Sequence, residues 1–228
     1  PEEKATHFLV SIQDESLSSR LIHLDPVRGG GEIIGESVHW LDLACWFFAP
    51  QIPVEVLAWG SPRLSHGINV KFSGGDDATI IFSCAGTFDY PKEFYEVTNN
   101  GALFRNCFFV ENNYYGVPGL NIEKFPLQFD GMEHIGAEGG MAGYQKKYHA
   151  KIGNSTNSKK ELGEISVDKG HSSMLNTFVD AVLNNTDSPC TEIDGWVSMM
   201  LARQAIKSIE LRQAINITPD KVKPCIVI

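Results

Sequence analysis

Alternating apolar and polar residues between positions 53 and 110 constrain the fold of this chain most strongly. The sequence predicts strands over 53–61, 68–72, 78–84, 93–98 and 102–110, because a two-residue period is typical of half-buried strands. Asn100-Gly101, between the last two segments, is a strong hairpin signal. Consecutive hairpins predict an antiparallel sheet, since a parallel pair needs a long crossover connection.

Helical patterns flank this series of strands. The apolar segment 38–49 predicts a buried helix, and amphipathic helices are predicted over 170–184 and 194–213. In the helix over 170–184, the residues expected to face inward are Met174, Phe178, Ala181 and Val182. Short strands are predicted over 6–13 and 215–217.

This order of elements predicts an α+β fold. We expect a large open, predominantly antiparallel sheet with helices packed on one face. A chain of 228 residues can bury one good core. We therefore expect a single domain over 1–228, with residues 1–5 and 218–228 peripheral.

Charge and cysteine content exclude several classes of partner. The formal net charge is −9, and the lysines and arginines do not cluster, so nucleic acid and anionic membranes are poor partners. No segment approaches the roughly 20 apolar residues that cross a bilayer. The five cysteines are widely spaced, without the spacing of zinc ligands. We expect no metal site and a cytoplasmic protein with reduced thiols.

The segment Arg28–Asp42, RGGGEIIGESVHWLD, holds the candidate functional residues. Its glycines let the backbone approach packed chain or a ligand closely. His39 and Asp42 follow, three residues apart and therefore on one helix face. A histidine there can carry a proton, because its pKa lies near neutrality. The alternative is a tight turn before a buried helix, with a hydrogen-bonded core histidine.

Nucleotide-binding patterns are absent from the sequence. No Gly-x-Gly-x-x-Gly follows a strand and opens a helix, and there is no P-loop. Gly29-Gly30-Gly31 lacks the required spacing and the preceding strand. A Gly-x-Ser-x-Gly elbow is also absent, which disfavours a hydrolase.

Three segments in order resemble one known family. Gly29-Gly30-Gly31-x-x-x-Gly35-Glu36-x-x-His39-x-x-Asp42 resembles the active-site segment of the glucose–fructose oxidoreductase / inositol dehydrogenase (Gfo/Idh/MocA) family. Residues 169–181 resemble that family's penultimate helix, and residues 188–195 resemble the approach to its last helix. The resemblance extends from about residue 6 to 217 and implies the family's C-terminal domain.

The resemblance also implies an activity. Family members are two-domain enzymes that move a hydride between NAD(P) and a sugar or polyol hydroxyl. It implies that NAD or NADP is bound mainly by a Rossmann domain, absent from this chain, which also supplies a catalytic lysine. His39 would be the acid/base residue. Gly35 stands where many members have an aspartate that orients the histidine, so Glu36 is expected to take that catalytic role.

Substrate-binding residues are expected around this segment and on the sheet. They are Gly31, Gly35, Asp42, Tyr90 and Tyr115; sugars stack on aromatic rings such as those of the two tyrosines. The hypothesis is a substrate-binding and catalytic-histidine domain that is inactive as an isolated chain. The alternative is a non-catalytic sugar-binding or oligomerisation module with the same fold. Because an exposed sheet face needs cover, we expect a homodimer or tetramer through the sheet.

Overall fold

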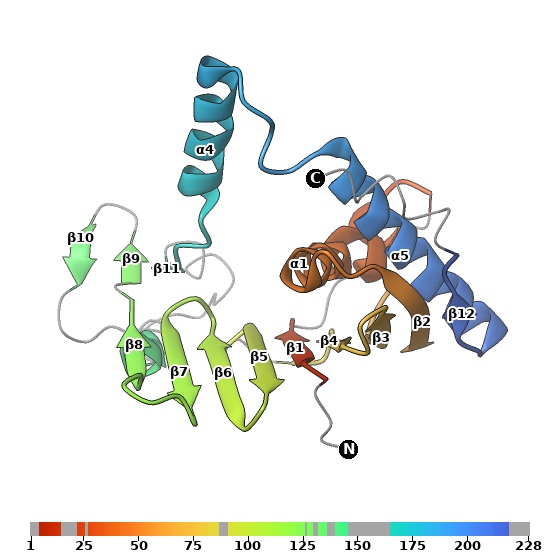
Figure 1. Cartoon of the computed structure of the whole chain (residues 1–228), viewed down its shortest axis with the longest axis horizontal. Helices are drawn as coiled ribbons and strands as arrows, with labels where there is room; N and C mark the ends of the chain where they lie inside the picture. Colours follow the sequence, from red (N-terminus) through yellow and green to blue (C-terminus); the bar gives the residue numbers. More distant parts are fainter. Residues whose placement is uncertain are drawn as a thin grey trace. The chain divides into compact units, whose positions relative to one another are not determined.

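The computed structural model of the chain describes two compact units (Figure 1). The described residues are 5–14, 22–25, 27–86, 91–125, 127–129, 132–135, 140–145 and 165–218. The first unit contains Pro1–Thr87, Tyr95–Asn100 and Cys190–Ile228, and the second contains Phe88–Phe94 and Gly101–Pro189. The expectation of a single domain over 1–228 stays a prediction.

The predicted strands and helices all occur, with ends within a few residues of those expected. The elements of the first unit are β1 (His7–Gln13), the 3₁₀ helix η1 (Ile22–Leu24), the π-helix η2 (Ile33–Ser37), α1 (Val38–Phe48), β2 (Pro53–Gly60), β3 (His66–Phe72), β4 (Asp77–Ser83), α5 (Glu192–Leu211) and β12 (Ile215–Asn216). β5 (Glu93–Asn99) has residues in both units. Those of the second unit are β6 (Ala102–Cys107), β7 (Glu111–Tyr115), β8 (Ile122–Lys124), β9 (Leu127–Phe129), β10 (Met132–Ile135), β11 (Ile165–Ser166) and α4 (His171–Asn184).

The main sheet has nine strands in the order β12-β2-β3-β4-β1-β5-β6-β7-β8. Its hairpins are antiparallel, as predicted. The exception is β1, which lies parallel to β4 with His7 opposite Asp77. A parallel neighbour needs a long connection, and the chain from β1 to β4 supplies it with α1 and the β2–β3 hairpin. The predicted fold class, an open and mostly antiparallel sheet with helices, is confirmed.

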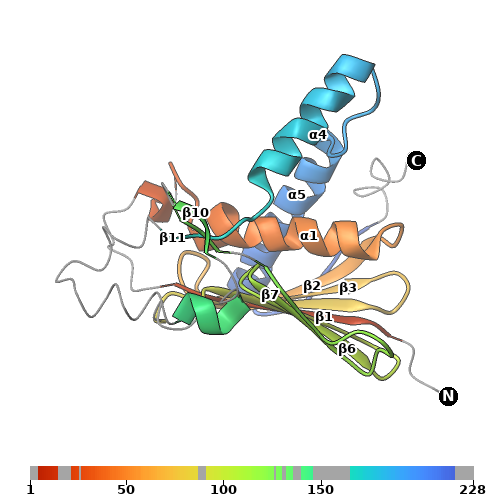
Figure 2. The same ribbon diagram turned by 90° about the vertical axis from the view of Figure 1, so that its left-hand side faces the viewer.

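The core of the first unit lies between one sheet face and two helices. Alternate residues of three strands are buried on this face: Phe8, Val10, Ile12, Ile68, Val70, Phe72, Ala78, Ile80 and Phe82. Figure 2 shows α1 and α5 side by side above the strands of this unit. α1 buries Leu41 and Phe48, and α5 buries Leu201 and Ala205. The ring of Phe48 lies 4.6 Å from that of Phe72, centroid to centroid. The helices therefore cover one face.

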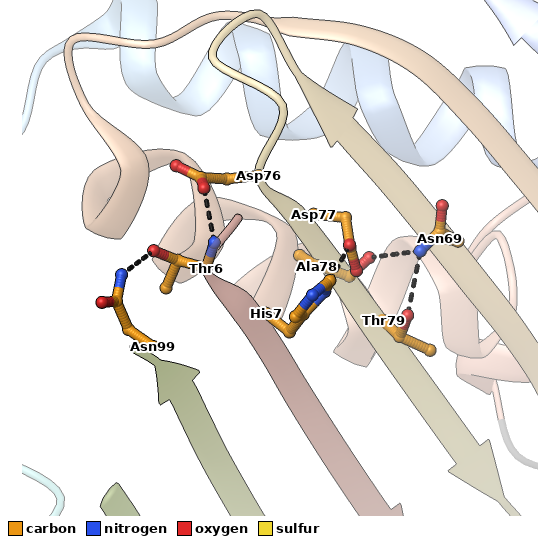
Figure 3. A network of polar contacts seen from close by, with 8 residues as sticks. All are labelled: Thr6, His7, Asn69, Asp76, Asp77, Ala78, Thr79 and Asn99. Carbon is orange, nitrogen blue, oxygen red and sulfur yellow. Dashed lines mark hydrogen bonds and ion pairs between the residues drawn. The ribbon is translucent and has the colours of Figure 1, made fainter. Parts of the chain in front are cut away.

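Polar side chains fix the start of β1 between its two neighbours (Figure 3). The Thr6 N–H donates to Asp76 Oδ1 at 2.6 Å, and the Asn99 side-chain amide donates to Thr6 Oγ1 at 2.5 Å. The Gln51 amide donates to the other Asp76 oxygen. One loop carboxylate therefore anchors the strand that enters the middle of the sheet.

The opposite face of these strands, which we call the open face, carries apolar and paired polar residues in register. Leu57, Asn69, Thr79 and Leu9 lie in one row across the four strands. In the next row the Trp59 ring lies across Gly67, because a Cβ at Gly67 would be 2.2 Å from Trp59 Cζ2. The exposed apolar residues of the open face are Leu9, Leu57, Trp59 and Ile81. The Lys71–Glu55 ion pair, at 2.7 Å, and the hydrogen bond between His7 Nδ1 and Asp77 Oδ2, at 2.6 Å, border them.

A partly buried ion pair organises part of the second unit. The Lys169 ammonium contacts both oxygens of the buried Glu93 carboxylate, at 2.8 and 2.7 Å. It also lies 5.5 and 5.4 Å from the ring centroids of Phe108 and Phe109. These phenylalanines have φ values of 48° and 57°, which is uncommon and strained for bulky residues. The Phe108 N–H donates to the Glu93 carbonyl at 2.9 Å, which holds this turn in place.

Helix α4 has the predicted bounds, but its burial differs from the prediction. Of the four residues expected to face inward, Ala181 is buried, whereas Met174, Phe178 and Val182 are exposed. A helical period predicts which residues share a face, but not what covers that face.

Candidate functional site

Asp25 begins the turn that leads to the candidate residues. Its carbonyl accepts hydrogen bonds from the Gly29 and Gly30 N–H groups, both at 2.8 Å. Its carboxylate accepts from the N–H groups of Arg28 at 2.8 Å and Val27 at 2.9 Å. These backbone donors lower the pKa of the Asp25 carboxyl, since they stabilise its charged form. Sequence reasoning missed Asp25, although an Asp-Pro pair is a turn signal.

Gly31 packs against the turn between β2 and β3. Its φ is +86°, and a Cβ there would lie 2.6 Å from Arg63 Cα and 2.9 Å from the Pro62 carbonyl oxygen. The glycine is buried, so this close approach is made to protein backbone. A dinucleotide phosphate needs backbone N–H groups turned toward an open cradle. The glycine turn therefore does not fit a dinucleotide, and a binding role for Gly31 stays a prediction.

The π-helix η2 connects the glycine turn to α1. The Val38 N–H donates to the Ile33 carbonyl five residues earlier, and such π-turns are rare and frequent at functional sites. Gly35 and His39 are exposed, and Glu36 is partly buried. A Cβ at Gly35 would meet nothing within 4 Å. The exposed position of His39 differs from the buried histidine of the alternative interpretation.

Asp42 lies on α1 where that helix meets the first turns of α5. Burial raises the pKa of Asp42, and the Asp194 carboxylate raises it further. A hydrogen bond from Ser198 and the charge of His39 act in the opposite direction. Asp194 is already engaged in the capping box of α5, where Thr191 N–H donates to its carboxylate at 2.7 Å. The observed neighbours of Asp42 are thus helix-end groups and His39, and its role toward substrate stays a prediction.

Two further residues of this region were not selected from the sequence. Ser37, the last residue of η2, contacts His66 at the start of β3, with 2.7 Å between Oγ and Nε2. Both residues are buried. No local sequence signal links them, because they are 29 positions apart and meet only through the fold.

Of the two tyrosines expected to bind substrate, the structure describes only Tyr115. Tyr115 ends β7 in the second unit, and its side chain is exposed. Tyr90 lies outside the described residues. The other five expected residues lie along one continuous segment: Gly31, Gly35, Glu36, His39 and Asp42. Among them, the structure records an electrostatic interaction between His39 and Asp42.

Metal-ligand clusters and membrane-spanning helices are both absent from the described ranges. No group of three or more His, Cys, Asp or Glu side chains there is arranged to hold a metal ion. None of the helices in the described part is long and apolar enough to span a bilayer.

Comparison with solved structures identifies the fold. The chain is similar to an NAD-binding oxidoreductase from Klebsiella pneumoniae, with a TM-score of 0.62 and 14% identity over 93% of this chain and 58% of that chain. It is similar to the aldose-aldose oxidoreductase from Caulobacter crescentus in complex with glycerol, with a TM-score of 0.60 and 11% identity over 92% of this chain and 55% of that chain. It is also similar to myo-inositol 2-dehydrogenase from Lactobacillus plantarum, with a TM-score of 0.59 and 17% identity over 94% of this chain and 57% of that chain.

These likenesses concern about half of each oxidoreductase. No protein-family model matches the sequence, and no curated protein matches it. At 11–17% identity the likeness shows the fold alone. The chain thus has the fold of the C-terminal domain of the Gfo/Idh/MocA oxidoreductases, as the resemblance of its motifs implied.

Proposed function

We propose that this chain is the substrate-binding and catalytic-histidine domain of an NAD(P)-dependent oxidoreductase that acts on a sugar or polyol hydroxyl. The observation that carries the proposal is the position of His39. It is exposed in the first turn of α1, directly after the glycine turn and η2. The fold is that of half of several oxidoreductases, two of which are named for aldose and myo-inositol chemistry.

The chemistry assigned to His39 is removal of the hydroxyl proton. When a secondary alcohol becomes a carbonyl, its O–H proton goes to an imidazole nitrogen while its carbon loses a hydride. A positioned base of this kind contributes about 10²–10⁴-fold to the rate. Glu36, three residues before His39, is proposed to orient the imidazole. Asp42 adds a carboxyl group beside the same histidine.

The nicotinamide cofactor would accept the hydride, and it is proposed to bind mainly to a separate dinucleotide-binding domain. The packing of Gly31 supports a cofactor site outside this segment, because Gly31 contacts protein backbone and leaves no room there for a dinucleotide. This chain would then supply the substrate-binding surface and the acid/base residue of a shared site.

The four described cysteines, Cys45, Cys84, Cys107 and Cys190, are thiols, which supports a proposed cytoplasmic location.

The test of the proposal joins the chain to a dinucleotide-binding domain of a related oxidoreductase and measures NAD(P)H formation with a panel of sugars and polyols. His39→Ala should lower kcat/KM by about 10²–10⁴-fold, as expected for loss of a general base. His171→Ala is the matched control, because His171 is an exposed first-turn histidine of another helix. Full activity of His39→Ala would overturn the catalytic assignment.

The alternative function is a sugar-binding or oligomerisation module without chemistry. Titration calorimetry of the chain with glycerol, myo-inositol and hexoses separates the two. A fused protein that binds a sugar but never reduces the cofactor supports the module. A fused protein that turns over that sugar supports the enzyme.

We also propose that a second copy of the chain covers the open face, giving a homodimer or a tetramer. The support is the group of exposed apolar residues on this face, Leu9, Leu57, Trp59 and Ile81. Exposed apolar surface of this kind favours association, because covering it removes apolar area from water.

A further inference from the structure

A buried hydrogen bond links the segment that carries His39 to the sheet beneath it. Ser37 is 0% exposed and His66 is 4% exposed, and 2.7 Å separates Ser37 Oγ from His66 Nε2. Polar groups buried this deeply are costly unless they are paired. The two side chains are therefore expected to form a hydrogen bond with each other. Which of them donates depends on which nitrogen of the His66 ring carries the proton.

The second ring nitrogen of His66 fixes that direction. His66 Nδ1 lies 2.5 Å from the Leu64 carbonyl oxygen, which can only accept, so the proton is on Nδ1. Burial lowers the pKa of His66, which favours the neutral ring. Nε2 then carries the lone pair and the Ser37 hydroxyl must donate to it. The Phe82 ring, stacked parallel at 5.3 Å between centroids, holds the imidazole plane.

This hydrogen bond replaces the usual role of a serine at a helix start. Ser37 is the N-cap residue of α1, where a serine side chain commonly accepts from a backbone N–H. In the described structure its side chain makes no capping hydrogen bond. Its hydroxyl proton is committed to His66 on β3. Glu36 precedes this anchor directly, and His39 follows it by two residues.

The other end of the same segment is anchored on the same hairpin turn. Gly31 packs against the backbone of Pro62 and Arg63, and His66 follows that turn as the first residue of β3. The stretch from Gly31 to Ser37 is therefore fixed at both ends on the β2–β3 turn. Rigid support of this kind is what catalytic groups need, because small displacements cost large factors in rate.

We propose that His66 is a positioning residue which, through Ser37, holds Glu36 and His39 in their working geometry. The proposal rests on the proposed function for its kinetic consequence, but not for its structural consequence. Gly35 leaves no side chain at that position to hold His39. The Ser37–His66 hydrogen bond is proposed to hold the backbone of this segment in place instead.

The structural test uses the 228-residue chain and needs no cofactor. Nitrogen-15 NMR of the imidazoles should show His66 as the neutral Nδ1–H form at pH 7. Ser37→Ala and His66→Phe should raise amide hydrogen exchange over residues 33–39 by about tenfold or more, since a local anchor is lost. His66→Gln, which keeps an acceptor oxygen near the Nε2 position, should restore much of the protection. Exchange at β4 amides is the internal control for global folding.

The kinetic test uses the same variants in the fusion protein. Ser37→Ala should lower kcat by about tenfold with KM within about twofold, because positioning is lost and ground-state binding is kept. The double variant Ser37→Ala/His66→Phe should lose little more than either single one. Unchanged exchange over 33–39 in Ser37→Ala, or additive losses in the double variant, would overturn the proposal.

The two levels of failure are distinguishable. If His39→Ala leaves turnover unchanged, the proposed function fails, while the exchange data still decide the anchor. If His39→Ala abolishes turnover and Ser37→Ala changes neither exchange nor kcat, the anchor fails and the function stands. If His66→Phe unfolds the chain, Ser37→Ala still tests the anchor by hydrogen exchange over residues 33–39, because it removes only a single oxygen atom.

Discussion

Two glycines of one short segment, Gly31 and Gly35, differ in what a side chain would meet. Gly31 has a left-handed backbone, and the Arg63 Cα lies only 2.6 Å from the position that a Cβ would occupy. Gly35 has open space around it and no positive φ. The same residue type therefore serves close packing at one position and leaves room at the other.

Gly31→Ala should destabilise the first unit by about 2–4 kcal/mol, because left-handed strain adds to a backbone clash. Gly35→Ala should change stability by less than about 1 kcal/mol, since alanine favours helical backbone. Urea unfolding followed by the fluorescence of the buried Trp40 measures both. Equal stabilities of the two variants would contradict the packing assigned to Gly31.

At the scale of elements, single polar contacts decide where helices and turns attach. Asp76 fixes the start of β1, His66 fixes the start of α1, and Glu93 holds the segment before α4 through Lys169. Each of these contacts joins residues distant in sequence. The sequence pattern predicts where helices and strands lie along the chain, whereas these contacts determine how they pack on one another.

Lys169→Met should cost on the order of 3 kcal/mol, because it leaves the Glu93 carboxylate buried without its cation. The protected amide to follow is that of Phe108, which donates to the Glu93 carbonyl. Hydrogen exchange there should accelerate strongly. Lys71→Met is the matched control, since the Lys71–Glu55 pair lies on the open face with Lys71 mostly exposed. Similar effects of the two variants would mean that burial of Glu93 is unimportant.

At the scale of the whole molecule, the chain has the fold of only part of an oxidoreductase. It spans 55–58% of the length of the similar structures. The open face is the surface through which the whole assembly is proposed to form.

Trp59→Lys should weaken self-association by about 30-fold or more, because a central tryptophan of an interface commonly contributes about 2 kcal/mol or more. Trp46→Lys is the matched control, since Trp46 is also exposed but lies on α1. Light scattering at micromolar concentration distinguishes monomer, of 25.2 kDa, from larger species. A monomeric wild-type chain, or equal effects of both substitutions, would contradict the proposed interface.

The sequence by itself determined the elements and the candidate segment. Two-residue and 3.6-residue periods are local properties, so the strands from Pro53 to Cys107 and the helices α1, α4 and α5 followed from them. The glycine and histidine spacing likewise located His39. Tertiary structure alone decided three further features: the parallel pairing of β1 with β4, the contact of Ser37 with His66 and the packing of Gly31 on Arg63. These contacts join residues about 30 to 70 positions apart, and a local period has no information on which distant segment will supply the partner.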